Sequence, residues 1–291
     1  MKVLLTGASG FIGRHVGAAL ARAGHQVVPV SRRGGVDMAQ RVCAAAWRPL
    51  LEGVDAVINA AGIVAESRAQ TFLAVHRQGP EALFRACAMA GVRRVIQVSA
   101  LGADGQAFSA FHLSKRGADE VLRGLPLDWL VLRPSLVHGP GGCSARLFWR
   151  MAAWPVVPVL GPGQQWIQPL HIDDLVDALM QGLGLPATRL TLDLVGPERL
   201  GFAEWLQRLR DAQGLGPIRL VQVPEPAALA LARLAGVWSP LLRPDNLRML
   251  QAGRTGDPRA LEHLLGRRAR ALRGDLLDPG QPARGSRACP I

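Results

Sequence analysis

Short apolar runs alternate with longer amphipathic segments through the first half of the chain. The apolar runs have strand length and lie at residues 2–6, 26–30, 55–59, 94–99 and 129–132. Between them, residues 11–23, 69–90 and 109–123 carry apolar positions at helical spacing, and the second segment is expected to be interrupted near Gly79-Pro80. Strands that alternate with helices in this way are typical of βαβ units. The pattern therefore predicts an α/β fold with a doubly wound parallel sheet.

The pattern changes after Gly139. Glycines and prolines cluster through residues 139–169, an irregular loop region is expected over residues 151–170, and helical spacing dominates from residue 202 to residue 273. The sequence thus predicts a first domain of residues 1–138 plus about 169–185, and a smaller, mainly helical C-terminal lobe of residues 139–168 plus about 186–273. Residues 274–291 have the composition of a disordered tail.

A glycine-rich loop connects the first predicted strand to the first predicted helix. In this context Gly7 permits a tight turn, Gly10 lets a pyrophosphate approach the backbone, and Gly13 lets the helix lie close to the sheet. Free N–H groups and the helix dipole then favour phosphates. The loop predicts a Rossmann-type nucleotide site, and the alternative is a tight turn without a ligand. The cofactor-binding residues predicted here are Gly7, Ser9, Gly10, Phe11, Ile12 and Gly13.

The residues after the second predicted strand indicate which cofactor the loop would hold. Ser31, Arg32 and Arg33 stand where an NAD-preferring protein places a carboxylate for the ribose 2′-hydroxyl. Two guanidiniums instead suit a 2′-phosphate, which they grip bidentately. The sequence therefore predicts NADP(H) in preference to NAD(H). The alternative is a pair of solvated arginines, because only Lys2 and Lys115 among the 34 basic residues are lysines.

The net charge of +12 raises the question of nucleic acid, which binds clustered Lys and Arg. No basic run is interleaved with aromatic residues, so nucleic-acid binding is not expected. The basic C-terminal region is predicted to be a solvated helix face, and contact with a membrane surface or a protein complex is the alternative. Its arginines are Arg267, Arg268, Arg270 and Arg273.

The spacing of the cysteines and the hydrophobicity of the chain indicate its cellular compartment and whether it holds a metal, a disulfide or a transmembrane segment. The four cysteines form no CxxC pair and share no histidine at ligand spacing, so neither a metal site nor a disulfide framework is predicted. A reducing cytoplasm is therefore expected. Residues 151–170 lack charge over a length that could span a bilayer, but the four prolines among them would break a helix, so no transmembrane segment is expected.

Further motifs follow the glycine loop in chain order. They are Asp37-Met38, Asn59-Ala60-Ala61-Gly62, Ser99, Arg133-Pro134-Ser135 with the residues up to 141, and His171-Ile172-Asp173-Asp174. Together they resemble the short-chain dehydrogenase/reductase superfamily in its extended or atypical, epimerase-like branch, from residue 1 to about residue 183. Residues 98–104 and 257–266 are similar to the subgroup that contains an accessory subunit of respiratory complex I and its bacterial relatives.

The resemblance assigns further cofactor contacts to the first domain. It places Asp37 and Met38 at the adenine, after a third strand that the short interval between residues 30 and 55 reduces to a stub near Val36-Asp37. It places Asn59, Ala60, Ala61 and Gly62 beneath the adenosine. Pro134 and Ser135 would lie by the nicotinamide.

The resemblance breaks at the reaction centre. Enzymes of this superfamily use a Tyr-x-x-x-Lys pair beside a serine, and the lysine lowers the pKa of the phenol and binds the ribose. Ser99 and Lys115 match the serine and the lysine, but Phe111 stands at the position of the tyrosine in a chain with no tyrosine at all. Lys115 is therefore expected at the ribose, the alternative being a surface lysine. His112 is a candidate replacement acid or base, although adjacent helical residues point about 100° apart.

Two functions are therefore compatible with the sequence. The first is an NADP(H)-dependent protein of the epimerase or reductase type with an unknown small-molecule substrate. The second is a non-catalytic NADP(H)-binding sensor or assembly factor similar to the complex I accessory subunit. Fold alone does not separate catalysis from binding.

Overall fold

The computed structural model describes residues 1–235, 241, 243–278 and 280, and its centre is a six-stranded parallel sheet. Runs of Val, Leu and Ile form these strands because both faces of the sheet are covered. The predicted doubly wound parallel sheet is confirmed. In spatial order the strands are β10 (Arg189–Leu194), β5 (Asp128–Pro134), β4 (Arg94–Val98), β3 (Ala56–Asn59), β1 (Lys2–Thr6) and β2 (Gln26–Val30).

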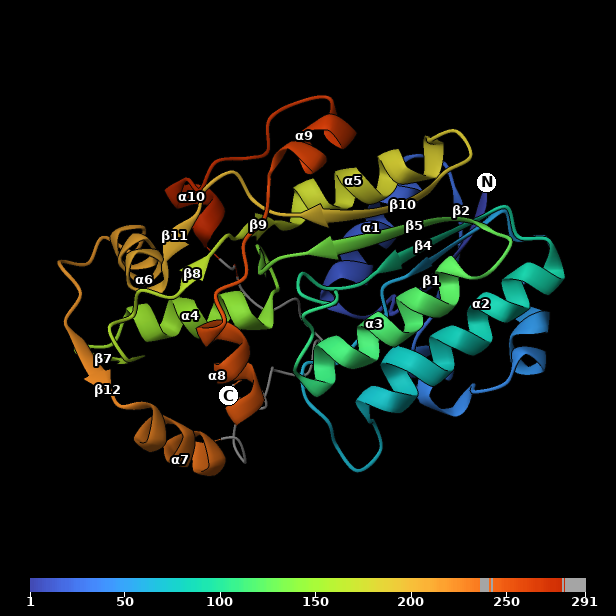
Figure 1. The fold of residues 1–291 in the computed structure, drawn as a ribbon. Coiled ribbons are helices and arrows are strands. Elements are labelled where there is room, and N and C mark those ends of the chain that lie inside the picture. The colour runs from blue at the N-terminus through green and yellow to red at the C-terminus, as the bar shows by residue number, and fades with distance from the viewer. Residues whose placement is uncertain (236–240, 242, 279, 281–291) are drawn as a thin grey trace. The chain divides into compact units, whose positions relative to one another are not determined.

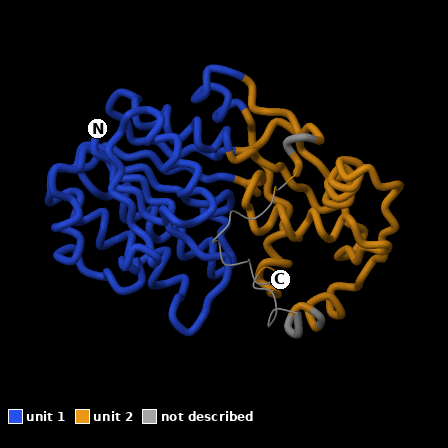
Figure 2. The backbone as a smooth tube through the Cα atoms, turned by 180° about the vertical axis from the view of Figure 1, so that it is seen from behind, with its two compact units in different colours: residues 1–134, 173–194, 259–267 blue, residues 135–172, 195–258, 268–291 orange. Residues whose placement is uncertain are grey.

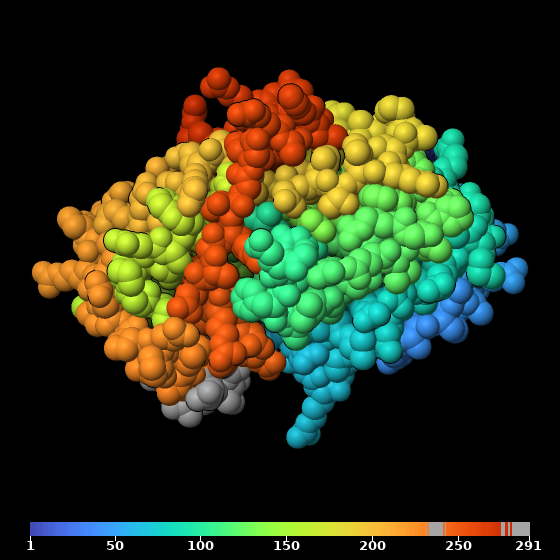
Figure 3. Space-filling view, in the orientation of Figure 1, coloured from blue at the N-terminus to red at the C-terminus, as the bar shows by residue number. Residues whose placement is uncertain are grey.

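Helices cover both faces of this sheet. Figure 1 shows α2 (Gly79–Ala90) and α3 (Ala110–Arg123) in front of the strands and α1 (Phe11–Arg22) behind them, and the space-filling view of the same side shows the front pair covering the sheet (Figure 3). The front pair packs on a core that contains Leu83, Val95 and Leu122, each fully buried. Helix α5 (Ile172–Gly184) also packs on the sheet, where a Cβ on its Gly182 would lie 2.7 Å from Leu130 Cδ2.

The predicted interruption near Gly79-Pro80 takes the form of a π-helical turn, η4 (Leu73–Gln78), that leads directly into α2. A π turn of this kind widens the helix and is frequent at functional sites. It places His76 inside the fold, where the side chain is fully buried. The helix therefore begins later than residue 69, where the apolar spacing starts.

No third strand lies between β2 and β3 in the described chain, so the expected stub is wrong. Three short 3₁₀ turns occupy the interval: η1 (Arg32–Gly34), η2 (Met38–Gln40) and η3 (Ala44–Leu50). The last turn buries Trp47 completely, and its Nε1 donates to the carbonyl of Arg41 at 3.0 Å. The interval is thus ordered by one large side chain and not by strand pairing.

The chain divides into two compact units (Figure 2). Unit 1 contains residues 1–134, 173–194 and 259–267, and unit 2 contains residues 135–172, 195–258 and 268–291. Unit 1 ends at Pro134, resumes at Asp173 within α5 and extends through β10 to Leu194, and it also contains α9 (Arg259–Leu265). Its bounds differ from those of the predicted first domain, residues 1–138 plus about 169–185.

Unit 2 is mainly helical and has its own core around Phe202, Trp205 and Leu209. The region 151–170, expected to be irregular, contains short strands, so that expectation is wrong in part. The elements of unit 2 are β6 (Val137–His138), α4 (Cys143–Ala152), β7 (Val157–Leu160), β8 (Trp166–Ile167), β9 (Leu170–His171), β11 (Leu200–Gly201), α6 (Phe202–Asp211), β12 (Leu220–Val223), α7 (Glu225–Ala235), α8 (Pro244–Gln251) and α10 (Gly274–Leu277).

The basic C-terminal region is not a helix face, which corrects the expectation for it. Helix α9 ends at Leu265, and the residues up to 273 are not helical. Arg267 pairs with Asp174 and Asp177 of α5, so it ties α9 to the sheet domain. Most of the predicted disordered tail lies outside the described residues. No helix within the described ranges is long and apolar enough to cross a membrane.

Candidate nucleotide-binding site

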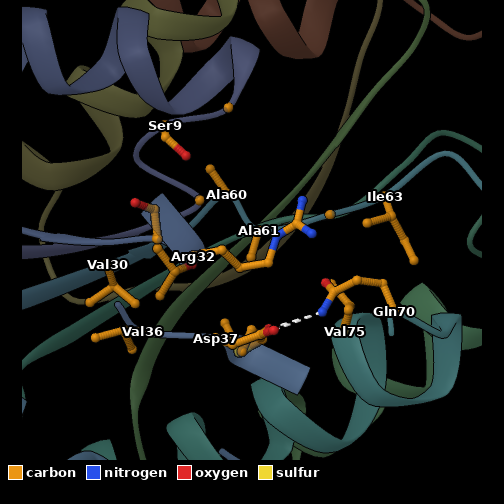
Figure 4. Close-up of a pocket in the computed structure, with 16 residues that line it drawn as sticks. Ser9, Val30, Arg32, Val36, Asp37, Ala60, Ala61, Ile63, Gln70 and Val75 are labelled. Carbon is orange, nitrogen blue, oxygen red and sulfur yellow. Dashed lines mark hydrogen bonds between the residues drawn. The ribbon is translucent and has the colours of Figure 1, made fainter. Parts of the chain in front are cut away.

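A pocket lies at the carboxyl ends of β1, β2 and β3, where open α/β sheets bind ligands (Figure 4). It belongs entirely to unit 1. Its walls combine the glycine loop, the turn after β2 and the loop after β3. The lining residues are Thr6, Gly7, Ser9, Gly10, Val30, Ser31, Arg32, Val36, Asp37, Met38, Ala60, Ala61, Gly62, Ile63, Gln70 and Val75.

The three loop glycines have different roles in the structure. Gly7 has φ +66°, and a Cβ there would lie 2.5 Å from the carbonyl oxygen of Ala60. A Cβ on Gly13 would lie 2.1 Å from the carbonyl oxygen of Gly7. Gly10 is the N-cap residue just before α1, and a Cβ there would meet only that same oxygen, at 3.0 Å. Gly7 and Gly13 are therefore required by packing, whereas Gly10 leaves an open cradle at the start of the helix, which fits a pyrophosphate.

The remaining residues predicted in the loop divide into two groups. Ser9 lines the pocket beside Gly10. Phe11, Ile12 and Gly13 belong to the first turn of α1 and do not line it, and the Phe11 ring packs edge-on against His15. Their cofactor contact stays a prediction, carried by the backbone of the helix start.

The turn after β2 separates the two predicted arginines. Ser31 begins η1, and its Oγ accepts from the backbone N–H of Gly34 at 3.2 Å. Arg32 lines the pocket, and Figure 4 shows its side chain extended across it. Arg33 is exposed and does not line the pocket. Of the two predicted arginines, Arg32 therefore lines the pocket and Arg33 does not.

Asp37 is fixed in the pocket by a residue that sequence reasoning missed. Its Oδ1 accepts from the backbone N–H of Ala39 at 3.0 Å and caps η2, which buries Met38. The Gln70 Nε2 donates to Oδ1 at 3.0 Å and to Oδ2 at 2.9 Å (Figure 4). Gln70 is 5 % exposed, so it forms a rigid side of the pocket. Nothing in the sequence marks Gln70, because it carries no motif and lies just before the π-helical turn.

A buried hydrogen-bond chain begins at Thr6, which lines the pocket. Thr6 Oγ1 donates to Asn59 Oδ1, and Asn59 Nδ2 donates to Gln97 Oε1 at 2.6 Å. These three residues are fully buried at the ends of β1, β3 and β4. Asn59 thus joins three neighbouring strands just before the segment Ala60–Gly62, and the predicted position of these residues beneath an adenosine stays a prediction.

Lys115 is buried, so the alternative of a surface lysine is wrong. The side chain is 4 % exposed, and its Nζ donates to the carbonyls of Val98 at 3.0 Å and Ala61 at 3.3 Å. Burial lowers the pKa of Lys115 from 10.5 to about 8, and the nearby Asp119 carboxylate opposes that shift. The ammonium therefore lies at the ends of β3 and β4, at the edge of the sheet where the pocket opens.

Ser99 is paired with Asp119, a residue that sequence reasoning also missed. The Ser99 Oγ donates to Asp119 Oδ2 at 2.6 Å, and both side chains are buried. Burial raises the pKa of Asp119 from 3.8 to about 6, although Ser99, Lys115 and Arg133 all favour the carboxylate. Asp119 lies one helical turn after Lys115, a spacing from which the sequence could have suggested it.

Aromatic rings surround Phe111. Its ring packs edge-on against Phe72 at 5.9 Å and His76 at 5.2 Å. Nε2 of His76 accepts from the Ile63 N–H at 2.9 Å, and Nδ1 lies 3.1 Å from Ser114 Oγ. Burial lowers the pKa of His76 well below its usual value, so the ring is neutral and both nitrogens are engaged.

The other predicted residues lie as follows. His112 is buried, and its Nδ1 lies 3.0 Å from Ser109 Oγ at the start of α3, so it helps to cap this helix. Pro134 ends β5 in unit 1, whereas Ser135 belongs to unit 2 and donates to the carbonyl of Gln168 at 2.5 Å. Within the described residues, no cluster of His, Cys, Asp and Glu could hold a metal ion.

Comparison with known proteins identifies the family. The model of the NAD-dependent epimerase/dehydratase family matches residues 3–188. A ceramide reductase of Caulobacter vibrioides is 30 % identical over 254 residues, which cover 82 % of this chain and 78 % of that protein.

Subunits of respiratory complex I are also similar. The mitochondrial NADH-ubiquinone oxidoreductase 40 kDa subunit of Neurospora crassa is 26 % identical over 209 residues, which cover 71 % of this chain and 55 % of the subunit. The mitochondrial NADH dehydrogenase 1 alpha subcomplex subunit 9 of Arabidopsis thaliana is 29 % identical over 251 residues, which cover 78 % of this chain and 61 % of that subunit. The match thus spans less than two thirds of either subunit.

Solved structures share the fold. A UDP-glucose 4-epimerase from Thermotoga maritima superposes with a TM-score of 0.72 at 16 % identity, covering 96 % of this chain and 97 % of that one. MoeE5 in complex with UDP-glucose and NAD superposes with a TM-score of 0.71 at 22 % identity, covering 95 % of this chain and 96 % of that one.

Proposed function

The chain belongs to the NAD-dependent epimerase/dehydratase family, and from this premise we propose that it binds NADP(H) in the pocket of unit 1 and acts as a reductase without the family's tyrosine. The cradle at Gly10 would hold the pyrophosphate, Asp37 the adenine and Lys115 the ribose. Bound NADPH supplies a hydride for a carbonyl carbon. The chain's own residues must then orient the carbonyl and provide a proton to its oxygen.

The observation that carries the NADP(H) preference is the position of Arg32. It lines the pocket at the end of β2, and the carboxylate that would select NAD is absent from Ser31-Arg32-Arg33. A guanidinium there forms charge-assisted hydrogen bonds with a 2′-phosphate. Such bonds contribute about 1.5–3 kcal/mol, or roughly 10- to 150-fold in affinity.

Two matched variants test this preference. Arg32→Asp and Arg33→Asp change the charge equally, but only Arg32 lines the pocket. We expect wild type to bind NADPH more tightly than NADH in a fluorescence titration, Arg32→Asp to narrow or reverse the preference, and Arg33→Asp to retain it. Equal dissociation constants for the two cofactors in wild type would refute the preference.

The ceramide reductase of Caulobacter vibrioides supports reduction as the direction of the reaction, because it matches most of both chains. We accordingly infer a ketone on a ceramide-like lipid as the first substrate class to test. The readout is NADPH oxidation with product identified by mass spectrometry. If the wild-type protein binds NADPH but reduces none of the ketones tested, the reductase assignment is refuted.

A non-catalytic role is supported by a different observation. The chain has no tyrosine, and the complex I subunits are among its relatives. As a sensor or assembly factor, the protein would retain NADP(H) in the absence of turnover and would bind a protein complex. Retained cofactor together with co-purifying subunits would favour this role. A cytoplasmic location is inferred because the spacing of the cysteines indicates no disulfide framework, and cell fractionation tests it.

A further inference from the structure

The Ser99 and Asp119 pair lies in unit 1 at the end of β4, against α3. Ser99 is 4 % exposed and Asp119 is 0 % exposed, and the hydroxyl donates to Asp119 Oδ2 at 2.6 Å. Asp119 Oδ1 has no hydrogen-bond partner within the described chain. A buried carboxylate is costly when one of its oxygens is unsatisfied. The surroundings therefore favour the protonated form more than those of an ordinary aspartate.

The charges around Asp119 are mostly positive and come from three sides. Lys115 and Arg123 lie on its own helix, and Arg133 of β5 lies with its Nε 3.8 Å from Asp119 Oδ2. Asp193 of β10 lies with its Oδ1 3.9 Å from Nη1 of Arg133, and its carboxylate offsets part of the arginine's charge. Burial outweighs these cations and raises the pKa of Asp119 to about 6. The carboxyl of Asp119 therefore holds its proton to a higher pH than an exposed aspartate does.

The protonation state of Asp119 sets the direction of the hydrogen bond. When Asp119 is a carboxylate, it can only accept, so the Ser99 hydroxyl must donate to it. When Asp119 is protonated, its O–H donates to Ser99 Oγ instead. The Ser99 hydrogen is then free to reach another acceptor. The pair thus exists in two states that differ in where the Ser99 proton is directed.

We propose, on the basis of the proposed reductase function, that Asp119 and Ser99 form a proton relay that takes the place of the missing phenol. As the carbonyl carbon accepts hydride from NADPH, its oxygen takes the proton of Ser99, and Ser99 Oγ takes the proton of Asp119. Asp119 is left as a carboxylate, and after the alcohol leaves it takes a proton back from Ser99, which takes one from the water that replaces the alcohol. The sum is one carbonyl, one NADPH and one proton consumed, with one alcohol and one NADP⁺ formed.

The first test needs neither cofactor nor substrate. Infrared difference spectra of the protein alone follow the C=O stretch of protonated carboxyl groups from about pH 4 to 8. We expect a band that titrates near pH 6 in wild type, is lost in Asp119→Asn and moves to higher pH in Ser99→Ala, because the Ser99 hydrogen bond lowers the pKa of Asp119. Glu120→Gln is the matched control, since that carboxylate lies next to Asp119 but is exposed and paired with Arg116. Identical spectra for wild type and Asp119→Asn would overturn the relay.

The second test follows NADPH oxidation with 4-nitrobenzaldehyde from pH 5 to 8. The wild-type rate should fall as pH rises through about 6, because the relay needs protonated Asp119. Asp119→Asn and Ser99→Ala should each lose about 10²-fold in kcat and the pH dependence, with NADPH affinity retained. Glu120→Gln should behave as wild type.

The outcomes separate the relay from the function on which it rests. Turnover that Asp119→Asn retains, or a wild-type rate independent of pH, overturns the relay and leaves the reductase function standing. Bound NADPH with no turnover at any pH by wild type overturns the reductase function and the relay with it.

Discussion

Alanine substitutions at Gly10 and Gly13 should separate cofactor binding from folding. A Cβ on Gly13 would lie 2.1 Å from the Gly7 carbonyl oxygen and 2.7 Å from its carbon. Relief to an ordinary contact of about 3.4 Å requires the backbone of α1 to move by roughly 1 Å away from the loop. Overpacking of this kind costs about 1–3 kcal/mol, and Gly13→Ala should cost about 3 kcal/mol because the atoms in the way are backbone atoms of Gly7 and Ala8.

Gly10→Ala faces a smaller obstacle. Its Cβ would meet only the Gly7 oxygen, at 3.0 Å, and a shift of a few tenths of an ångström relieves that contact. We expect a loss of stability under about 1 kcal/mol. The methyl group, however, occupies the space through which a pyrophosphate approaches the backbone, so NADPH affinity should fall by roughly 10- to 150-fold.

Urea denaturation measures the free energy of unfolding, and a fluorescence titration measures the affinity for NADPH. The reasoning predicts a folded Gly10→Ala that binds poorly and a destabilised Gly13→Ala. If Gly10→Ala binds NADPH as tightly as wild type, the loop is a turn and the pocket is not a nucleotide site. If Gly10→Ala is destabilised as much as Gly13→Ala, the open cradle is refuted.

Two further predictions concern charges at the two ends of the sheet. Arg94→Met should lower the free energy of unfolding by about 3–5 kcal/mol, because it leaves Asp128 and the carbonyls of Gly182 and Pro186 without their buried donor. The control Arg93→Met removes an exposed pair with Asp55 and should cost under about 1 kcal/mol in urea denaturation. Between about pH 8 and 10.5, Lys115 binds more protons in the unfolded chain than in the folded one. The free energy of unfolding of wild type should therefore rise with pH by up to about 3 kcal/mol over this range. Lys115→Met should remove this rise. The difference between wild type and Lys115→Met isolates this effect, because Cys87, whose pKa burial raises to about 12, is present in both.

The sheet could be predicted from the sequence because its strands are buried on both faces. The strands β1 and β2 begin and end where the apolar runs do. The edge strand β10 was missed although its residues alternate between polar and apolar, because its burial is only partial. It is held instead by pairing with β5 along its whole length, a non-local interaction that periodicity does not show.

The candidate site could be predicted only where a motif marks it. The glycine loop, Asn59 and Lys115 have recognisable neighbours in the sequence, and the structure gathers them at the carboxyl edge of the sheet. Gln70 and Asp119 act through partners 33 and 20 residues away, so only the folded chain shows what they hold. Buried polar partners of this kind are selected by geometry and not by local pattern.

The last prediction concerns Phe111, the proposed position of the missing phenol. Its ring packs edge-on against Phe72 and His76, and Lys115 follows one helical turn later. Phe111→Tyr adds one hydroxyl to a ring that the site already accommodates, and a nearby ammonium favours its ionisation. We therefore expect NADPH-dependent reduction of 4-nitrobenzaldehyde to rise by about 10²-fold or more over wild type. Phe108→Tyr is the matched control, because that ring is 48 % exposed just before α3.

A second comparison ties Phe111 to the Asp119 relay. A tyrosine that delivers the proton itself no longer needs Asp119, so Asp119→Asn should cost far less in the Phe111→Tyr background than in wild type. The two changes would then be non-additive, as expected for residues that serve the same step. Equal activity of the Phe111→Tyr and Phe108→Tyr variants, with NADPH bound to both, would show that residue 111 does not face the reacting carbonyl. Additive effects of Phe111→Tyr and Asp119→Asn would show that the phenol and the carboxyl serve different steps.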